Sequence, residues 1–353
     1  ELVFPGGVTA QIALARQEKY ARAGAKPQVT PGTIQEDLRC RDFTVNAIAL
    51  ALNRAARGLL IDPMNGLADL NRHELRALQS TSLYDDPRRL LRLLRLKIRL
   101  GYTVEERTQS QYLAAREAQM ERFVSRRALC EELKQIAEEP NPGEVVRVLQ
   151  EEGLLALFSS ALAAGKLNLA GLAKLERARR LLPPDAGYLD LNWAPFFLAL
   201  TEKLSPKERA ALLQATEMRK TEVSPWKNLP PRTKKLENTV KAARLKKPSQ
   251  VYGVLSKAAG NEILYLLYQS TMRLVHDRIK NYLQKYLALA QEITDAEVQA
   301  AGATPGTPRF AKLKEEMIVA RVDGRTKKPP PPPEPPPPLP GPRRGRPPRS
   351  LTM

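Results

Sequence analysis

The sequence predicts a mainly α-helical protein with a small α/β part at its N-terminal end. Beyond about residue 80, apolar residues recur at steps of three and four, the period of an amphipathic helix. Before that point, short β-branched runs alternate with Pro and Gly turns, a pattern typical of short strands. Apolar residues make up 42% of the 353 residues, enough for two or three domains with cores of their own.

In the N-terminal part we expect two strands and one helix. The roughly alternating run 8–15 predicts a strand after a Pro-Gly-Gly turn. Residues 46–53 predict a helix that ends near Gly58. The apolar run 58–62 predicts a short buried strand, which Pro63 stops.

The remainder predicts helices. We expect them over residues 88–100, 125–139 and 142–150, with breaks in the later helices at Pro183-Pro184 and Pro230-Pro231. Nearer the C-terminus, one amphipathic stripe predicts a face that packs into a core. Its members are Leu274, Val275, Ile279, Tyr282, Leu283, Tyr286, Leu287 and Ala290.

The C-terminal segment 327–353 predicts a disordered, basic tail. Residues 329–348 hold 13 of the chain's 30 prolines, and proline cannot donate the amide hydrogen bonds of helix or sheet. The tail ends in a basic group that resembles an AT-hook, although a basic arm on RNA phosphates is the favoured interpretation. Its arginines are Arg343, Arg344, Arg346 and Arg349.

The charge of the chain favours a polyanionic partner. Lys and Arg number 57 against 38 Asp and Glu, so the formal net charge is +19. The segment 325–349 holds seven basic residues and one acidic residue, which leaves +13 for the rest of the chain. A basic excess spread over folded segments favours RNA or DNA ahead of an anionic membrane surface.

Cysteine usage and the N-terminus indicate the compartment. Two cysteines, Cys40 and Cys130, cannot build a disulfide framework, which favours a reducing, intracellular location. With only His73 and His276 beside them, they lack the spacing of a zinc site. No apolar run reaches the roughly 18 residues of a membrane span. The chain starts at Glu1, as a mitochondrial or plastid protein would after removal of a targeting peptide, or as a sequence that lacks its upstream part would.

Four blocks in the first third of the chain carry charged residues at fixed spacing. Residues 37–47 read Asp-Leu-Arg-Cys-Arg-Asp-Phe-Thr-Val-Asn-Ala, and residues 61–70 read Ile-Asp-Pro-Met-Asn-Gly-Leu-Ala-Asp-Leu. Asp-Asp-Pro-Arg-Arg-Leu-Leu-Arg follows at 85–92, and Leu-Gly-Tyr-Thr-Val at 100–104. In this order the blocks resemble those of the class II tRNA nucleotidyltransferase and poly(A) polymerase family, which adds CCA or A residues to RNA 3′ ends.

The resemblance spans roughly residues 8–326 and implies an order of domains. Residues 1–80 correspond to a partial nucleotidyltransferase head, and 81–160 to a helical neck with a nucleotide-template-like motif. Residues 161–326 correspond to a helical body and tail that bind RNA. The predicted fold is therefore a truncated head followed by helical neck, body and tail.

The charged pairs in these blocks can bind a nucleotide. Arg41 offers guanidinium donors to a phosphate, and Asp42 offers acceptors to ribose hydroxyls. Asp86 and Arg89, three residues apart, can match a base edge, the use that the resemblance implies. Asn46 and Arg92 complete the predicted nucleotide-binding set. Capping of a helix is the alternative for both Asp42 and Asp86.

Further basic groups predict contacts with RNA. Arg88, Arg92, Arg95 and Arg99 line one helical face, and four arginines without interspersed acids repel one another unless an external anion relieves them. A second candidate phosphate-binding patch is Lys234, Lys235, Lys241, Arg244, Lys246 and Lys247. Asp62 and Asp69 are interpreted as structural.

The metal-binding carboxylates of the family are missing from the sequence. Phosphoryl transfer requires metal ions, which the family holds with an Asp-x-Asp pair, and no such pair stands in the first 36 residues. Gln11 aligns where several relatives carry an acid, Cys40 replaces an arginine and Asn65 a glycine. We therefore assign no catalytic residue, no metal ligand and no cofactor in this sequence.

Three functions follow. The leading hypothesis is an RNA-binding pseudo-enzyme that serves as a structural component of a ribonucleoprotein, for example on rRNA in a mitochondrial ribosome, beside other proteins. The alternative is an active CCA-adding enzyme or poly(A) polymerase that uses Mg²⁺ with CTP or ATP on tRNA, its catalytic segment absent from this sequence. The third is DNA binding through the Arg-Gly-Arg-Pro tail.

Overall fold

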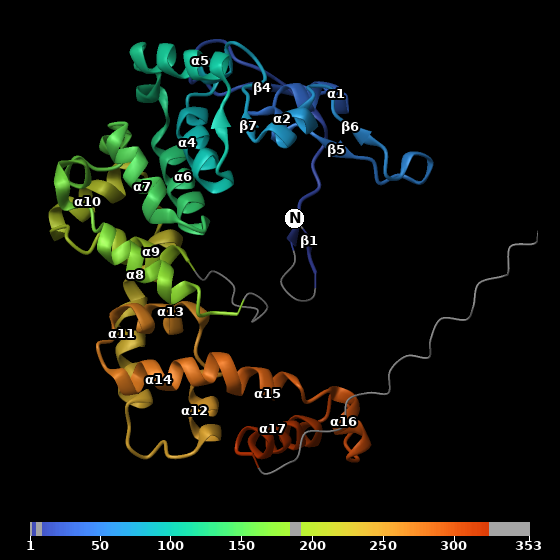
Figure 1. Cartoon of the computed structure of the whole chain (residues 1–353), viewed down its shortest axis with the longest axis vertical. Helices are drawn as coiled ribbons and strands as arrows, with labels where there is room; N and C mark the ends of the chain where they lie inside the picture. Colours follow the sequence, from blue (N-terminus) through green and yellow to red (C-terminus); the bar gives the residue numbers. More distant parts are fainter. Residues whose placement is uncertain (1, 5–8, 184–191, 325–353) are drawn as a thin grey trace, which may run out of the picture. The chain divides into compact units, whose positions relative to one another are not determined.

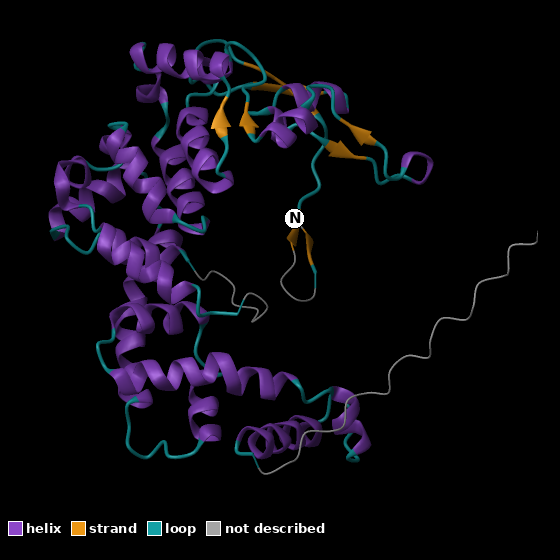
Figure 2. Ribbon diagram, in the orientation of Figure 1, coloured by secondary structure: helices purple, strands orange, loops and turns teal. Residues whose placement is uncertain are grey.

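Helices dominate the computed structural model, which describes residues 2–4, 9–183 and 192–324 (Figure 1, Figure 2). The mainly α fold with a small strand-containing part is confirmed. Contacts between residues divide the chain into two compact units, Glu1–Ala288 and Leu289–Met353. In the described ranges, no helix has both the length and the apolarity that a bilayer span requires.

The described strands are short and pair two by two. Pairing is antiparallel for the first three pairs and parallel for the last. The strands are β1 (Leu2–Val3) with β2 (Thr9–Ala10), β3 (Arg16–Lys19) with β4 (Gln28–Pro31), β5 (Ala49–Leu50) with β6 (Leu60–Ile61), and β7 (Glu74–Leu75) with β8 (Thr103–Val104).

Two predictions for the N-terminal part are wrong. Of the described residues 9–15 in the first predicted strand, Thr9–Ala10 alone forms a ladder, and the longer strand β3 starts at Arg16. The predicted helix 46–53 is instead a 3₁₀ turn, η2 (Thr44–Asn46), followed by β5. A short apolar run does not distinguish helix from strand, and pairing with β6 decides the outcome here. The strand predicted over 58–62 forms as β6, but Leu60 is exposed rather than buried.

Helices make up the rest of the larger unit. They are α1 (Ile34–Arg39), α2 (Gly66–Arg72), α3 (Ser82–Asp85), α4 (Arg88–Leu100), α5 (Glu106–Glu117), α6 (Arg126–Glu138), α7 (Pro142–Glu151), α8 (Leu169–Arg179), α9 (Trp193–Leu200), α10 (Pro206–Ala215), α11 (Lys220–Val240), α12 (Pro248–Leu255), α13 (Gly260–Gln269) and α14 (Arg273–Asn281). Short 3₁₀ helices are η3 (Arg54–Ala56), η4 (Met120–Phe123) and η5 (Leu154–Leu157), and two π-helical segments are η6 (Leu162–Lys166) and η7 (Tyr282–Tyr286).

The smaller unit holds α16 (Asp295–Ala300) and α17 (Pro308–Val322), and α15 (Leu287–Gln291) spans the division. Its core is a cluster of Ile293, Val298 and Ala303.

The sequence located α4, α6 and α7 to within about two residues, but the break predicted at Pro230-Pro231 is wrong. The helix α11 runs through both prolines and through Pro225. Trp226 and Leu229 of α11 are buried, and α11 packs against α9 and α13. This packing offsets the backbone hydrogen bonds that the prolines remove.

One hydrophobic cluster extends through the larger unit, from Phe43 to Leu283. This cluster continues across residues 80 and 160, so it does not mark the domain boundaries predicted there. Those boundaries remain predictions. In the stripe on α14, η7 and α15, Val275, Ile279 and Tyr282 are buried as predicted, whereas Leu274 is exposed. The predicted tail 327–353 lies outside the described residues.

Candidate nucleotide-binding site

Helix α4 has two different faces. Five of its leucines, among them Leu90 and Leu93, are buried in the main cluster, whereas Leu100 at its last turn is exposed. The helix begins directly after Pro87 and ends at Gly101, whose φ of 66° lies in the left-handed region that glycine adopts without strain. The arginines at three- and four-residue spacing line the opposite side.

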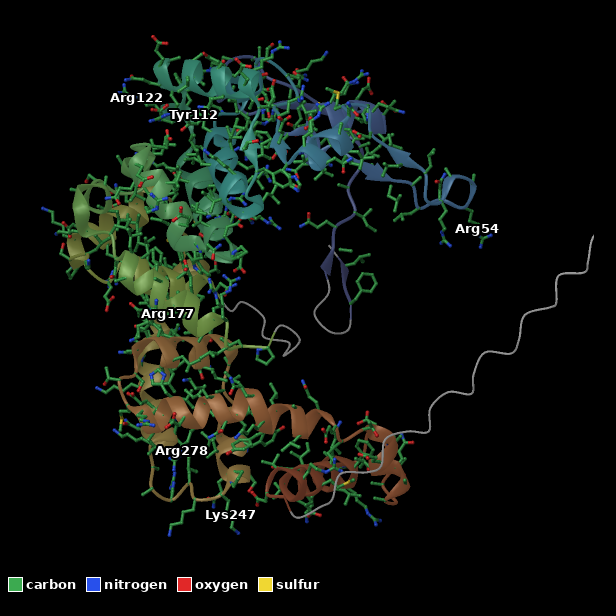
Figure 3. All side chains as sticks on the ribbon, in the orientation of Figure 1. Arg54, Tyr112, Arg122, Arg177, Lys247 and Arg278 are labelled. Carbon is green, nitrogen blue, oxygen red and sulfur yellow. The ribbon has the colours of Figure 1, made fainter. Side chains whose placement is uncertain are left out.

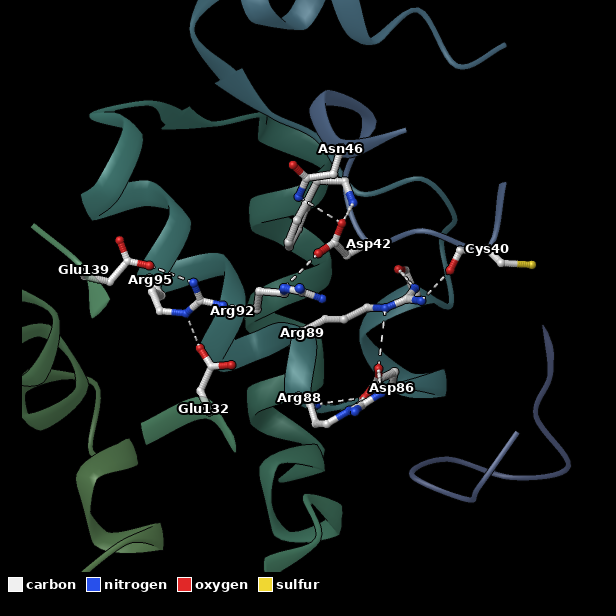
Figure 4. A network of polar contacts seen from close by, with 12 residues as sticks. Cys40, Asp42, Asn46, Asp86, Arg88, Arg89, Arg92, Arg95, Glu132 and Glu139 are labelled. Carbon is white, nitrogen blue, oxygen red and sulfur yellow. Dashed lines mark hydrogen bonds and ion pairs between the residues drawn. The ribbon is translucent and has the colours of Figure 1, made fainter. Parts of the chain in front are cut away.

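A cavity of about 610 Å³ lies along the arginine side of α4. The loop that follows α1 forms another wall, and Figure 4 shows the polar contacts between the two. All six residues of the predicted nucleotide-binding set line it, namely Arg41, Asp42, Asn46, Asp86, Arg89 and Arg92. Arg88, Arg95 and Arg99 line it as well, as does Gln11. Sequence analysis did not assign Arg16, Glu18, Asp37 and Gln135, which complete the polar lining.

The position of Asp42 is set by its neighbour Phe43. Phe43 is fully buried and pairs with Ala77 in an isolated β-bridge. One carboxylate oxygen of Asp42 accepts hydrogen bonds from the Phe43 amide at 2.8 Å and the Asn46 side-chain amide at 3.1 Å. The other lies 3.1 Å from Nε of Arg92. Asp42 therefore braces the η2 turn and also faces the cavity, so the capping alternative and the binding role coexist geometrically.

Arg41 is paired within the same loop. Its Nε donates to Oδ1 of Asp37 at 3.0 Å, and a second guanidinium nitrogen lies 2.8 Å from the same oxygen. The other oxygen of Asp37 accepts from the backbone amide of Arg16 on β3. About half of the Arg41 side chain stays exposed, so phosphate oxygens can reach it.

Asp86 and Arg89 lie where α3 meets α4. Arg89 donates to the Cys40 carbonyl at 2.8 Å and to the Ser82 hydroxyl, and its Nε is 3.9 Å from Asp86. Asp86 accepts two hydrogen bonds of 2.7 Å from the guanidinium of Arg88 and one of 3.2 Å from the Arg88 amide. Asp86 thus satisfies the first backbone amide of α4, although Pro87 and not Asp86 holds the N-cap position. The hydrogen bonds to Asp86 raise the pKa of Arg88.

The arginines of the α4 stripe have carboxylate partners within the fold. The expectation that they need an external anion is therefore wrong. Arg95 is buried, and its guanidinium donates to Glu132 at 2.5 Å and to Glu139 at 2.7 Å. Burial opposes the charge of Arg95, but these two carboxylates outweigh it and raise the pKa of the guanidinium. Both donor edges of Arg95 are thus used inside the fold, which argues against an RNA contact. Arg99 keeps about half of its side chain exposed, 3.9 Å from Glu139.

The block at residues 61–70 makes hydrogen bonds to the η2 turn and to the start of α2. Asp62 accepts from the amides of Gly66 and Leu67 at the start of α2, and Asp69 accepts from the Thr44 hydroxyl at 2.7 Å. A side chain at Gly66 would collide with the Thr44 carbonyl. Asn65 has a φ of 58°, and asparagine tolerates this left-handed conformation better than most residues that could replace glycine. These contacts agree with the structural interpretation of both acids.

The lysine-rich patch lies away from this cavity. Lys234 and Lys235 are exposed on α11, while Lys241, Arg244, Lys246 and Lys247 are exposed between α11 and α12. Arg278, labelled in Figure 3 as is Lys247, holds this connection. Its guanidinium donates to the carbonyls of Ala242 at 3.0 Å and Leu245 at 2.7 Å. Arg343, Arg344, Arg346 and Arg349 lie outside the described residues, so their predicted RNA contacts remain predictions.

The described residues do not fit a magnesium site. Among them, no three His, Cys, Asp or Glu side chains lie together as metal ligands would. The cavity carboxylates Glu18, Asp37, Asp42 and Asp86 are each engaged by an arginine instead. We derive no metal-dependent step from these residues.

Comparisons with known proteins agree with the motifs. The profile of the poly(A) polymerase head domain matches residues 5–76. An A-adding tRNA nucleotidyltransferase of Geobacter sulfurreducens is 27% identical over 332 residues, which cover 92% of this chain and 37% of that protein. A CC-adding tRNA nucleotidyltransferase of Deinococcus radiodurans is 36% identical over 215 residues, 61% of this chain and 55% of that protein.

The chain thus spans between about a third and just over half the length of these relatives. A solved apo structure of a CCA-adding enzyme superposes with a TM-score of 0.50 at 24% identity, over 93% of this chain and 76% of that one. This likeness supports the fold. Taken with the four motif blocks, the matches support a class II tRNA nucleotidyltransferase and poly(A) polymerase family for this chain.

Proposed function

We propose that this chain selects CTP or ATP in the cavity beside α4 and holds a tRNA 3′ end, as the nucleotide-selecting part of a tRNA nucleotidyltransferase. One observation carries the proposal. Two acid–arginine sets, Asp42 with Arg41 and Arg92, and Asp86 with Arg89, face a single cavity of about 610 Å³. This volume falls in the range of small-molecule sites.

The first set suits the sugar and phosphates of a nucleotide. Arg41 and Arg92 each leave about half of the side chain exposed, and guanidinium groups bind phosphate oxygens through two donors at once. Asp42 is nearly buried and carries acceptors only, so it can receive hydrogen bonds from ribose hydroxyls.

The second set suits the base. Cytosine and adenine both present an exocyclic amino group, a donor, next to a ring nitrogen that accepts. Asp86 can accept from the amino group while Arg89 donates to the ring nitrogen. Uracil and guanine present a carbonyl and an N–H group at the corresponding positions, which would place an acceptor against Asp86. The pair therefore favours CTP and ATP.

The proposal assigns binding and selection to these residues, and not phosphoryl transfer. Transfer requires metal ions that bridge the phosphates, and the described residues do not fit such ions. RNA binding by the lysine patch on α11 and α12 complements the cavity, because exposed lysines contact phosphates without reading sequence.

The similarity to these relatives favours the enzymatic alternative over the hypothesis of a structural component of a ribonucleoprotein. Both relatives compared above are tRNA nucleotidyltransferases. A role in an organellar ribosome and a mitochondrial or plastid location stay predictions from the sequence.

Calorimetric titration with the four nucleoside triphosphates tests the proposal. We expect CTP or ATP to bind at least tenfold more tightly than UTP and GTP. Asp42→Asn should weaken that binding about 10- to 100-fold, since it removes a charged acceptor. Asp277→Asn, which changes an exposed acid of α14, is the matched control and should leave binding unchanged.

The same protein is then given tRNA that lacks its 3′ CCA. Binding of this tRNA together with selective nucleotide binding supports the proposal. RNA binding without any nucleotide selection would overturn it and would favour the scaffold.

A further inference from the structure

Arg88 occupies the acceptor edge of Asp86 in this structure. Both oxygens of Asp86 accept hydrogen bonds of 2.7 Å from the Arg88 guanidinium (Figure 4). Arg89, the other half of the base-reading pair, stays 3.9 Å away and donates to Ser82 and the Cys40 carbonyl instead. A guanidinium presents a planar pair of donors, so Arg88 fills the place where a base amino group would donate.

We propose that Arg88 is an internal competitor for the nucleotide base, so that CTP or ATP reaches Asp86 only after Arg88 has moved away. This inference rests on the proposed function and adds a residue that sets affinity and selectivity. It also replaces the RNA contact that the arginine stripe predicted for Arg88.

A competitor that moves aside requires a mobile Arg88 side chain and a fixed Asp86 side chain, and their exposed fractions differ in this sense. The Asp86 side chain is 12% exposed, whereas the Arg88 side chain is 55% exposed at the first turn of α4. Exposed ion pairs contribute little net free energy, because water and side-chain entropy oppose them. The Arg88–Asp86 pair can therefore open at modest cost, while Asp86 itself stays in place.

A second cavity offers Arg88 another position. It has a volume of about 320 Å³ and shares Asp86 and Arg88 with the larger cavity, so Arg88 lies on the wall between them. Asp85 also lines this second cavity, where it accepts from the Thr81 hydroxyl at 2.7 Å. A rotation of the Arg88 side chain would exchange the carboxylate of Asp86 for that of Asp85. The displaced guanidinium would then keep an acidic neighbour.

The competition acts on some nucleotides and not on others. CTP and ATP gain hydrogen bonds to Asp86 only when Arg88 has left, so each of them binds more weakly by the cost of opening the pair. UTP and GTP gain nothing from a free Asp86, because they would place a carbonyl against it. Removal of Arg88 should therefore tighten the binding of CTP and ATP alone.

The test is calorimetric titration of the full chain and of Arg88→Met with CTP, ATP, UTP and GTP. We expect Arg88→Met to bind CTP and ATP about fivefold more tightly than the unaltered protein, the factor that an exposed ion pair represents. UTP and GTP should bind as before. Arg88→Lys keeps the charge but loses the two-pronged donor, so its affinity should fall between the two. Lys97→Met removes an exposed charge from α4 outside the cavity and should change nothing.

Each other outcome overturns the inference in a recognisable way. Weaker binding of all four nucleotides by Arg88→Met would make Arg88 a phosphate contact. Equal tightening of all four would make it a steric obstacle without selectivity. Unchanged affinities would make the Arg88–Asp86 pair irrelevant to binding. No binding by either protein would overturn the proposed function, and the inference with it.

Discussion

The N-terminal segments and the helical part of the larger unit are held in different ways. From α4 to η7, buried leucines, phenylalanines and tyrosines of successive helices form one continuous cluster. The N-terminal segments contain a separate small cluster of Leu38, Ala47 and Leu78. They also leave Leu50, Leu52 and Leu59 more than half exposed. Among the described residues of this region, Phe43, Leu75 and Leu83 are the buried members of the main cluster, and Ala23, Val45, Ala77 and Tyr84 pack against it.

Polar contacts compensate for the small N-terminal core. The loop that carries Arg41 and Asp42 is tied to α4 through Asp42–Arg92 and through Arg89 to the Cys40 carbonyl. The candidate site thus lies where a region with little apolar burial meets a well-packed helix. Such regions move most easily, because few buried contacts must be broken to open them.

Arg95 is expected to give the largest effect, because it lies on the cavity stripe yet is packed like the helical core. Arg95→Met would leave Glu132 and Glu139 buried without their partner, at a cost of about 3–5 kcal/mol in the free energy of unfolding. Urea denaturation measures this cost. Arg99→Met, one turn further along and half exposed, should cost less than about 1 kcal/mol. Equal costs would contradict the assignment of Arg95 to the core.

The same deletion in the two regions compares their packing directly. Leu133→Ala in α6 should cost about 3–4 kcal/mol, since its neighbours in the large cluster cannot collapse into the space. Leu38→Ala should cost about 2 kcal/mol, since the small cluster around it can relax. Both side chains are almost fully buried, so the changes in the free energy of unfolding can be compared directly. A larger cost for Leu38 would reverse the comparison.

Glu222 joins α11 to α6 in a charged contact of the helical part. Hydrogen bonds from Arg127, and then from Lys134, hold the pKa of Glu222 well below its usual range, although burial opposes this. A depressed pKa contributes stability above the pKa of the unfolded chain, about 4.3, and loses it as the pH falls further. Glu222→Gln should therefore destabilise by about 1–2 kcal/mol at pH 7. That difference should shrink below about pH 4 in denaturation curves recorded across pH.

The smallest effect on folding is expected in the lysine patch. Lys246→Ala with Lys247→Ala should leave stability within about 0.5 kcal/mol, because both side chains are exposed. RNA affinity should lose about 0.7–0.9 of its logarithmic salt slope for each phosphate contact removed. Filter binding at several salt concentrations measures this slope. Lys97→Ala with Lys207→Ala, a matched exposed pair, should leave it unchanged.

The sequence alone determined several helices of the core and six of the charged and polar residues that line the cavity. Apolar period is a local property, so α4, α6 and α7 were predictable within about two residues. The motif blocks named Arg41, Asp42, Asn46, Asp86, Arg89 and Arg92, and all of them line one cavity.

Only the tertiary structure decided which partner each charge has. The carboxylates that pair with Arg95 belong to Glu132 and Glu139, which lie 37 and 44 residues further along the chain. No local sequence pattern connects residues so far apart. Residues 46–53 have a helical pattern, but the chain returns at Leu60–Ile61 and pairs with Ala49–Leu50 as a strand. Ion pairs and strand pairs are long-range contacts whose free energy depends on geometry, and a sequence pattern carries no information about that geometry.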